Sequence, residues 1–131
     1  MPVRDAVDIV HAIDAFAAAP NGGLIVLPPP QPPAHLEAIL RLATLHRLPG
    51  VYGGGRPVAA AGGLIIYGSD TADLHRRAAS YVDRLLRGAK VSELPVQFPT
   101  KYELIINLKT AKAIGLTIPE SFLLRADEVI E

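Results

Sequence analysis

The chain has 131 residues, half of them hydrophobic, and its 13 basic and 13 acidic residues balance to a formal net charge of zero at pH 7. This length and aliphatic content predict one ordinary globular domain with its own core. The balanced charge gives no electrostatic basis for binding nucleic acid or an anionic membrane. The chain has no cysteine, which excludes disulfides, iron–sulfur clusters and thiolate zinc sites.

No signal peptide or membrane-spanning run is visible in the sequence. After Met1 the chain passes within a few residues into a helical pattern, and its apolar runs are far shorter than a bilayer span requires. As written, the chain is expected to be soluble and not exported.

A helix and then a strand are predicted at the start of the chain. Asp5 and Asp8 mark a helix start, because carboxylates there accept the free amide protons of the first turn. One helical face is apolar and consists of Ala6, Ile9, Val10, Ile13, Phe16 and Ala17. Leu24–Leu27 is a continuous apolar run between Gly and Pro, which predicts a strand buried on both faces, as in a parallel sheet.

The next stretch predicts a stiff connection, a helix, a short strand and a loop. Five prolines within residues 28–33 exclude a helix and predict an extended connection. A helix is expected over about residues 34–46, with Leu36, Ile39, Leu40 and Ala43 on one face, and residues 49–52 predict a minimal strand. Gly53–Arg56 lacks the spacing of known phosphate-binding loops, so we interpret it as a flexible loop at the strand end.

Strand and helix alternate again in the second half. Gly62–Gly68 predicts a third strand, and Ser69 or Asp70 caps a long helix that ends at Gly88. The apolar stripe of this helix is Leu74, Ala78, Tyr81, Val82 and Leu85. Tyr102–Asn107 predicts a fourth strand with one more polar face, followed by a short helix over residues 108–114 that Gly115 ends, and Pro119 opens a last turn.

This order predicts an α/β fold with a layered, mostly parallel sheet and helices on both faces. In such sheets, ligands bind beyond the carboxyl ends of the strands. The candidate ligand-binding residues at three such ends are Pro30, Gln31, Gly54, Arg56, Tyr67, Ser69 and Asp70. Asp70 is also the best helix cap in the chain, so both roles stay open for it. No histidine pair has metal-ligand spacing and no serine lies in a GxSxG context, so no catalytic residue, metal or cofactor is predicted.

Several continuous stretches carry a family resemblance. They are Gly62–Asp70, Arg76–Arg84, Leu94–Val96, Pro99–Lys112, Leu116–Pro119 and Arg125–Glu131. Together they resemble the ABC-transporter substrate-binding proteins labelled as tryptophan/tyrosine transport binding proteins, and the similarity covers nearly the whole chain. The resemblance implies a type I periplasmic-binding fold, in which two α/β lobes are joined by three hinge crossings and the ligand lies in the cleft.

By this resemblance, the chain is the C-terminal portion of a longer, two-lobed protein. Residues 1–58 then belong to the second lobe, 62–90 cross to the first lobe, and 91–131 return to the second lobe and form the tail. The implied function is the solute-binding component of an ABC-type importer, which binds a small molecule in the interlobe cleft without catalysis. Its implied partner is an ABC permease, and its implied location is periplasmic or membrane-anchored and extracytoplasmic.

Two stretches depart from the family pattern and leave the ligand open between an amino acid and another small organic solute. Pro28–Pro30 stands where relatives often carry polar residues, and Gly53–Gly55 replaces a bulkier stretch before Arg56. A second interpretation is an α/β sensory or regulatory domain that binds a small molecule and acts through a protein partner. An upstream signal peptide beside permease and ATPase genes would favour transport.

The implied division between lobes also predicts association. The strand Gly63–Tyr67 is expected to lack its first-lobe neighbours, and an unpaired apolar edge invites pairing with another chain. We therefore expect a homo-oligomer of this fragment, with exchange of Gly62–Gly88 as one route.

Overall fold

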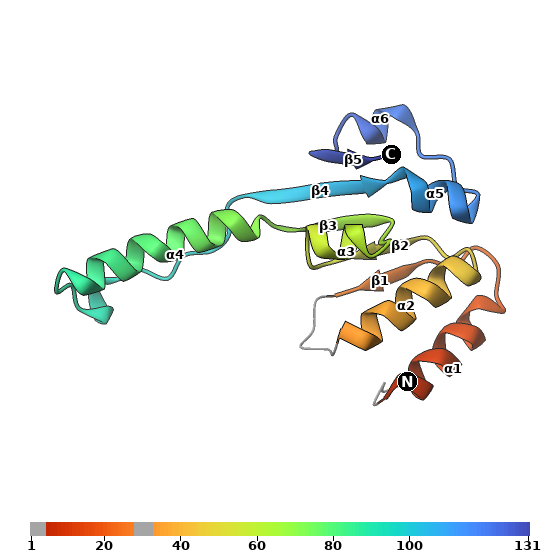
Figure 1. Ribbon diagram of the computed structural model, residues 1–131, viewed down its shortest axis with the longest axis horizontal. Coiled ribbons are helices and arrows are strands. Elements are labelled where there is room, and N and C mark those ends of the chain that lie inside the picture. The colour runs from red at the N-terminus through yellow and green to blue at the C-terminus, as the bar shows by residue number, and fades with distance from the viewer. Residues whose placement is uncertain (1–4, 28–32) are drawn as a thin grey trace.

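The computed structural model describes residues 5–27 and 33–131, in which five strands form one sheet (Figure 1). The strands lie side by side in chain order: β1 (Leu24–Val26), β2 (Gly50–Tyr52), β3 (Ile65–Ser69), β4 (Tyr102–Asn107) and β5 (Glu128–Ile130). The first three strands are parallel, β4 is antiparallel to β3, and β5 is parallel to β4. The prediction of a mostly parallel α/β sheet is confirmed.

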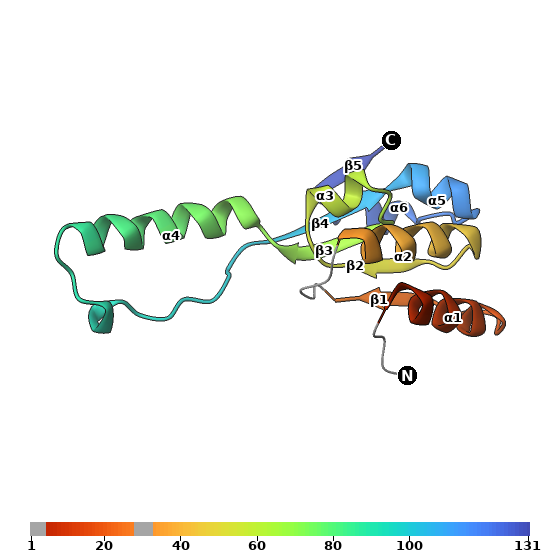
Figure 2. The ribbon, with the colours of Figure 1, turned by 60° about the horizontal axis from the view of Figure 1, so that its bottom comes forward.

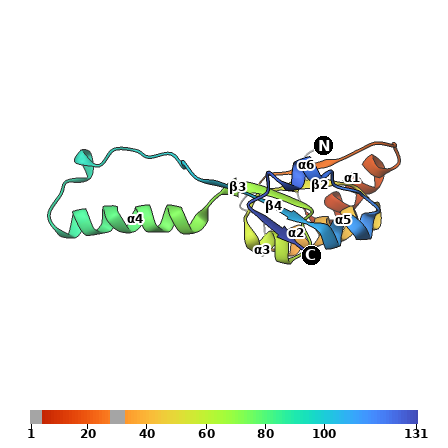
Figure 3. The same ribbon diagram turned by 90° about the horizontal axis from the view of Figure 1, so that it is seen from above.

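Helices cover the sheet unevenly. They are α1 (Ala6–Ala17), α2 (Pro33–Leu45), α3 (Arg56–Ala60), α4 (Thr71–Leu86), α5 (Leu108–Ile114) and α6 (Glu120–Leu123), with a 3-10 turn, η1 (Val91–Glu93). Figure 3 shows α2 and α3 on one side of the sheet and α6 on the other. Among the described helices, none combines the length and apolar character needed to cross a membrane.

The main core lies between the sheet and the pair α2 and α3. Tyr52, Ile66 and Ile105 are register neighbours on one sheet face, and each is at most 2% exposed. They pack with Leu40, Val58 and Ala59, which come from the two helices. A second cluster joins α1 to α2 and consists of Ile9, Ile13, Leu42, Ala43 and Leu48. The predicted apolar face of α2 is therefore confirmed, and that of α1 is confirmed at Ile9, Val10, Ile13 and Ala17. Ala6 and Phe16, near its two ends, are exposed instead.

Two predictions about the strands are wrong. Ile25, in the middle of β1, is 79% exposed, because β1 is the edge strand of the described sheet and only its other face is covered. The strand predicted at Gly63–Tyr67 does not lack neighbours, because β3 is the central strand. It pairs with β2 on one side and β4 on the other. The expected unpaired edge is absent there because β4 returns antiparallel and fills it.

Three further differences have local reasons. Gly53–Arg56 is not simply a flexible loop, because α3 begins at Arg56, with a proline in its first turn, where its missing N–H costs nothing. The strand β5 was not predicted, since its three residues are too few for a periodic pattern. In β4, Ile105, Ile106 and Asn107 are all buried, so its second half has no polar, exposed face.

Several helix ends form as predicted. The Asp5 carboxylate accepts hydrogen bonds from the backbone N–H groups of Val7 and Asp8, and Asp70 caps α4. Gly115 ends α5 in the left-handed conformation, with φ of 74°, which glycine adopts without steric cost. Pro119 is the N-cap of α6. These signals act over a few residues, which is why they can be read from the sequence.

One part of the chain extends away from the sheet. We call residues 71–101, which comprise α4, η1 and the extended segment that returns to β4, the arm; Figure 2 shows it running away from the packed elements. All 16 residues of α4 are half-buried or exposed. Within the arm, the Tyr81 hydroxyl donates a hydrogen bond to the Pro95 carbonyl. The arm is therefore held together by contacts between its own two passages.

Candidate functional site

The topology brings two of the three predicted loops to one edge of the sheet. Because β2 and β3 are parallel neighbours, Gly53–Arg56 and Tyr67–Asp70 end at the same edge. The amino ends of β4 and β5 reach this edge as well, since β4 runs antiparallel to β3. The other two candidates, Pro30 and Gln31, lie outside the described residues.

Gly54 lies closely against its surroundings. Its φ is 109°, a conformation that favours glycine, and a Cβ atom there would stand 2.7 Å from Val58 Cγ2 of α3. On the other side, a Cβ atom on Gly68 would stand 4.0 Å from the Gly54 nitrogen. The loop after β2 therefore contacts both the end of β3 and the start of α3.

Arg56 begins α3 and reaches toward β5. Its Nη2 atom lies 2.9 Å from Glu128 Oε2, with the Arg56 side chain 70% exposed. That Glu128 oxygen is buried and makes no hydrogen bond, so the contact is an ion pair without hydrogen-bond geometry. The pair joins the start of α3 to the start of β5 at the edge of the sheet.

A small cavity lies beside this ion pair. Its volume is about 150 Å³, and its lining residues are Arg56, Lys101, Tyr102, Glu103, Ile105, Asp127 and Glu128. Two cations and three carboxylates offer donors and acceptors to a small polar or zwitterionic solute. The volume is below the roughly 300–1,000 Å³ of common ligand pockets, so the cavity by itself is at most part of a site.

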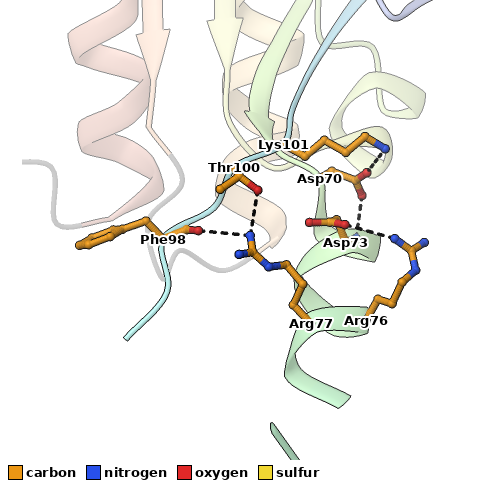
Figure 4. A network of polar contacts seen from close by, with 7 residues as sticks. All are labelled: Asp70, Asp73, Arg76, Arg77, Phe98, Thr100 and Lys101. Carbon is orange, nitrogen blue, oxygen red and sulfur yellow. Dashed lines mark hydrogen bonds and ion pairs between the residues drawn. The ribbon is translucent and has the colours of Figure 1, made fainter. Parts of the chain in front are cut away.

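Asp70 uses both of its carboxylate oxygens inside the chain (Figure 4). Oδ1 accepts a hydrogen bond of 3.0 Å from the Asp73 N–H, and Oδ2 lies 2.8 Å from Lys101 Nζ. The Lys101 hydrogen bond, followed by that from Asp73, lowers the pKa of Asp70, and the bond to Asp70 raises the pKa of Lys101. Its capping role is confirmed, while a ligand role stays a prediction.

Tyr67 and Ser69 lie on the opposite sheet face from the core that α2 and α3 cover. Side chains alternate along β3, and Ile66 between them points into that core. The Tyr67 ring is stacked on Tyr102, with centroids 5.8 Å apart and an interplanar angle of 14°. Tyr67 is 56% exposed and Ser69 is half-buried. Of the described candidates, Arg56 lines the cavity, and Asp70 contacts it through its ion pair with the lining residue Lys101. Tyr67 and Ser69 are not among the lining residues, although Tyr67 stacks on Tyr102, which is.

Lys101, Tyr102 and Glu128 were not predicted to belong to this edge. Tyr102 begins the predicted fourth strand and Lys101 directly precedes it, and an antiparallel course for that strand would have placed both next to Asp70. No comparable signal exists for Glu128, because β5 is too short to be recognised.

A wider groove lies at the opposite edge of the sheet, between α2 and α5. Its volume is about 670 Å³, and it includes Leu40, Leu45, Gly62 and Thr110. In residues 5–27 and 33–131, no three His, Asp or Glu side chains gather closely enough to hold a metal ion.

Several solved structures share this fold. A conserved domain protein from Vibrio cholerae superposes with a TM-score of 0.81 at 25% identity, over 95% of this chain and 42% of that one. The ABC domain in complex with L-Trp from Streptococcus pneumonia superposes with a TM-score of 0.78 at 23% identity, over 99% of this chain and 43% of that one. A ligand-free, open substrate binding protein with adhesive properties from Clostridium difficile superposes with a TM-score of 0.68 at 18% identity, over 98% of this chain and 42% of that one. The chain thus spans less than half the length of each.

Among curated proteins, none matches this chain. A family profile, described as ABC transporter substrate binding protein, matches residues 1–130. The match takes in both the sheet and the arm, and two of the solved structures that share the fold are named as an ABC domain and a substrate binding protein. The chain belongs to the ABC transporter substrate binding protein family.

Proposed function

We propose that this chain is the C-terminal portion of a two-lobed solute-binding protein that serves an ABC importer and binds a small molecule without catalysis. The family match supports the solute-binding role. The matched solved chains are more than twice as long as the part that this chain covers, which supports a missing lobe.

The arm is the observation that carries the proposal. Its helix α4 is amphipathic, yet Val82, Leu85 and Leu86 on it are 55%, 39% and 83% exposed. Most of a helix's stability in a protein comes from packing its apolar face, and an exposed apolar patch marks a contact surface. We therefore assign the arm to the first lobe and the five-stranded sheet to the second lobe.

The lobe boundaries follow from the strand pairing. Residues 62–69 remain with the sheet, because β3 pairs on both sides there. We place the crossing to the first lobe at Asp70 and the return at Lys101, which narrows the predicted crossing segment at its start and extends it at its end. The second lobe then comprises the described residues up to Ser69 and those from Tyr102 onward.

We further propose that the ligand lies at the sheet edge where the arm departs. Gly54, Arg56, Tyr67, Ser69 and Asp70 remain the proposed ligand-binding residues. The charged cavity beside Arg56 suits a polar group of the ligand. The ligand is an amino acid or another small organic solute, in keeping with the L-Trp complex of the pneumococcal relative. The proposed partner is an ABC permease, and the proposed location is extracytoplasmic.

The test is to purify the protein that carries this sequence from its natural source, without refolding. Mass spectrometry then identifies small molecules released on denaturation. Release of one solute in stoichiometric amount supports the proposal, and Arg56→Gln should reduce it while Arg41→Gln, an exposed arginine on α2, should not. If no solute is released, and no amino acid or similar solute raises the melting temperature, the proposed function is wrong.

A further inference from the structure

The arm and the sheet are joined by two neighbouring passages of the chain. Ser69 and Tyr102 are the last register pair of β3 and β4, and the Asp70 N–H donates a 3.0 Å hydrogen bond to the Lys101 carbonyl. Figures 2 and 3 show α4 and the returning segment leaving the sheet together at this place. We call residues 69–71 and 100–102 the joint.

Two backbone passages alone leave rotation possible, because a few φ and ψ changes at element ends are enough for a hinge. The direction of α4 therefore depends on side-chain contacts at the joint. Asp70 provides one, since its carboxylate holds the first turn of α4 through Asp73 and the returning passage through Lys101. Its side chain is 8% exposed, against 62% for Lys101. A buried carboxylate shared in this way fixes two elements relative to each other.

Arg77 provides a second contact, about two turns along α4. Its Nη1 atom donates hydrogen bonds to the Phe98 carbonyl at 3.3 Å and to Thr100 Oγ1 at 2.9 Å. In Figure 4, Arg77 and the Asp70–Lys101 pair reach the returning passage at successive places. Two separated contacts resist rotation of α4 about the joint in a way that one contact does not.

We propose that Asp70 and Lys101 are positioning residues that lock the direction of the arm relative to the sheet, with Arg77 as the second point of the lock. The ion pair, and not the helix cap, supplies the lock, since the cap holds Asp70 only to the first turn of α4. The ion pair and the Arg77 contacts instead reach across to the returning passage. The proposal concerns the geometry of this chain and requires no ligand. It therefore stands or falls separately from the proposed function.

The test measures a distance between arm and sheet. The chain has no cysteine, so Ala79→Cys on α4 and Ala113→Cys on α5, both at exposed positions, carry two spin labels without further changes. Pulsed dipolar spectroscopy of the labelled chain should give one narrow distance distribution. In Lys101→Met the distribution should broaden or its maximum should shift, and Arg77→Met should do the same to a smaller degree.

Two variants make the result specific. Arg87→Met removes the 2.9 Å ion pair with Asp83 at the C-terminal end of α4, with the same loss of charge but away from the joint, and should leave the distribution as in the parent. Asp70→Asn keeps an oxygen for the cap but removes the charge, and should act like Lys101→Met. Circular dichroism checks that each variant is folded. If Lys101→Met and Asp70→Asn are folded and keep the parent distribution, the inference is overturned; if Lys101→Met does not fold, Asp70→Asn decides.

Discussion

The side-chain amide of Asn107 joins β4 to α3, because its Nδ2 atom donates a 3.1 Å hydrogen bond to the Ala59 carbonyl. Its Oδ1 atom accepts from the Thr110 N–H at 3.1 Å and so caps α5. Asn107 is 5% exposed. One buried side chain thus connects a strand and two helices.

Replacing Asn107 by Ala should lower the free energy of unfolding by about 1–3 kcal/mol, since a buried hydrogen bond and the cap of α5 are lost together, although the Ala59 carbonyl keeps the Gly62 N–H as a donor. Asn107→Asp should retain the cap oxygen but not the donor to Ala59. Urea denaturation measures both, with Thr117→Ala at an exposed position as the control. Equal stability of Asn107→Ala and the control would contradict this account.

The Asp70–Lys101 ion pair should make stability depend on pH at both extremes. The pKa of Asp70 is lowered from 3.8, so its contribution is present above that pH and is lost as the pH falls through the lowered value. The pKa of Lys101 is raised from 10.5, so its contribution is present below that pH and is lost as the pH rises through the raised value. The charges of Asp73 and Glu103 act on Lys101 in the same direction.

Lys101→Met should therefore be less stable than the parent at neutral pH, and the difference should shrink as Asp70 becomes protonated in acid. Urea midpoints across the pH range measure the difference, and Lys109→Met, at an exposed position on α5, is the control. A difference between parent and Lys101→Met that stays constant down to acid pH would show that the ion pair is not its source.

Tyr52 should lose its phenol proton at a higher pH than an exposed tyrosine does. Its side chain is buried against Leu40 and Ile66, and this burial raises its pKa to about 12. The neutral phenol stabilises the fold below the ordinary pKa of 10, and this contribution is lost as the pH rises toward 12.

Absorbance of tyrosinate during alkaline titration should show a late step that belongs to Tyr52. The late step should be absent in Tyr52→Phe and should accompany loss of the circular dichroism signal in the parent. The same late rise in tyrosinate absorbance in the parent and in Tyr52→Phe would refute the prediction.

Self-association of this chain remains a prediction, but its basis moves from β3 to the arm. Leu86, Val96 and Phe98 are 83%, 88% and 80% exposed, and they belong to α4 and the segment that returns from it. Light scattering at micromolar concentration should detect a dimer or higher oligomer that Leu86→Glu and Phe98→Glu weaken. Leu124→Glu, at a residue 81% exposed after α6, should leave it unchanged. A monomeric parent would show that the arm is stable when exposed.

Much of the fold could be predicted because its signals are local. Helix caps at Asp5, Asp70 and Gly115 depend on the few residues around them, and the apolar faces of α1 and α2 follow from periodicity. The position of β3 between β2 and β4 depends instead on the antiparallel return of β4, some thirty residues later. That pairing has no local signature, so the expected free edge was wrong.

The candidate site could likewise be predicted from the sequence only in part. The edge that holds Gly54, Arg56 and Asp70 follows from the rule that strand ends in parallel sheets share an edge. Their partner Lys101 directly precedes β4 and their partner Glu128 begins β5, and the order and direction of these strands are set by tertiary pairing. The sequence could therefore indicate where the site lies, but not which charges meet there.

The hydrogen bond between the Asp70 N–H and the Lys101 carbonyl has a consequence for how such chains can be altered. It places the beginning and the end of the arm as neighbours, at roughly the 4.8 Å spacing of paired strands. Segments whose ends lie this close are the ones that tolerate insertion and exchange. We therefore expect that a tight turn or a different module can replace residues 71–100 while β3 and β4 keep their register. For engineering, Asp70 and Lys101 are therefore the positions between which we expect the arm to be removable.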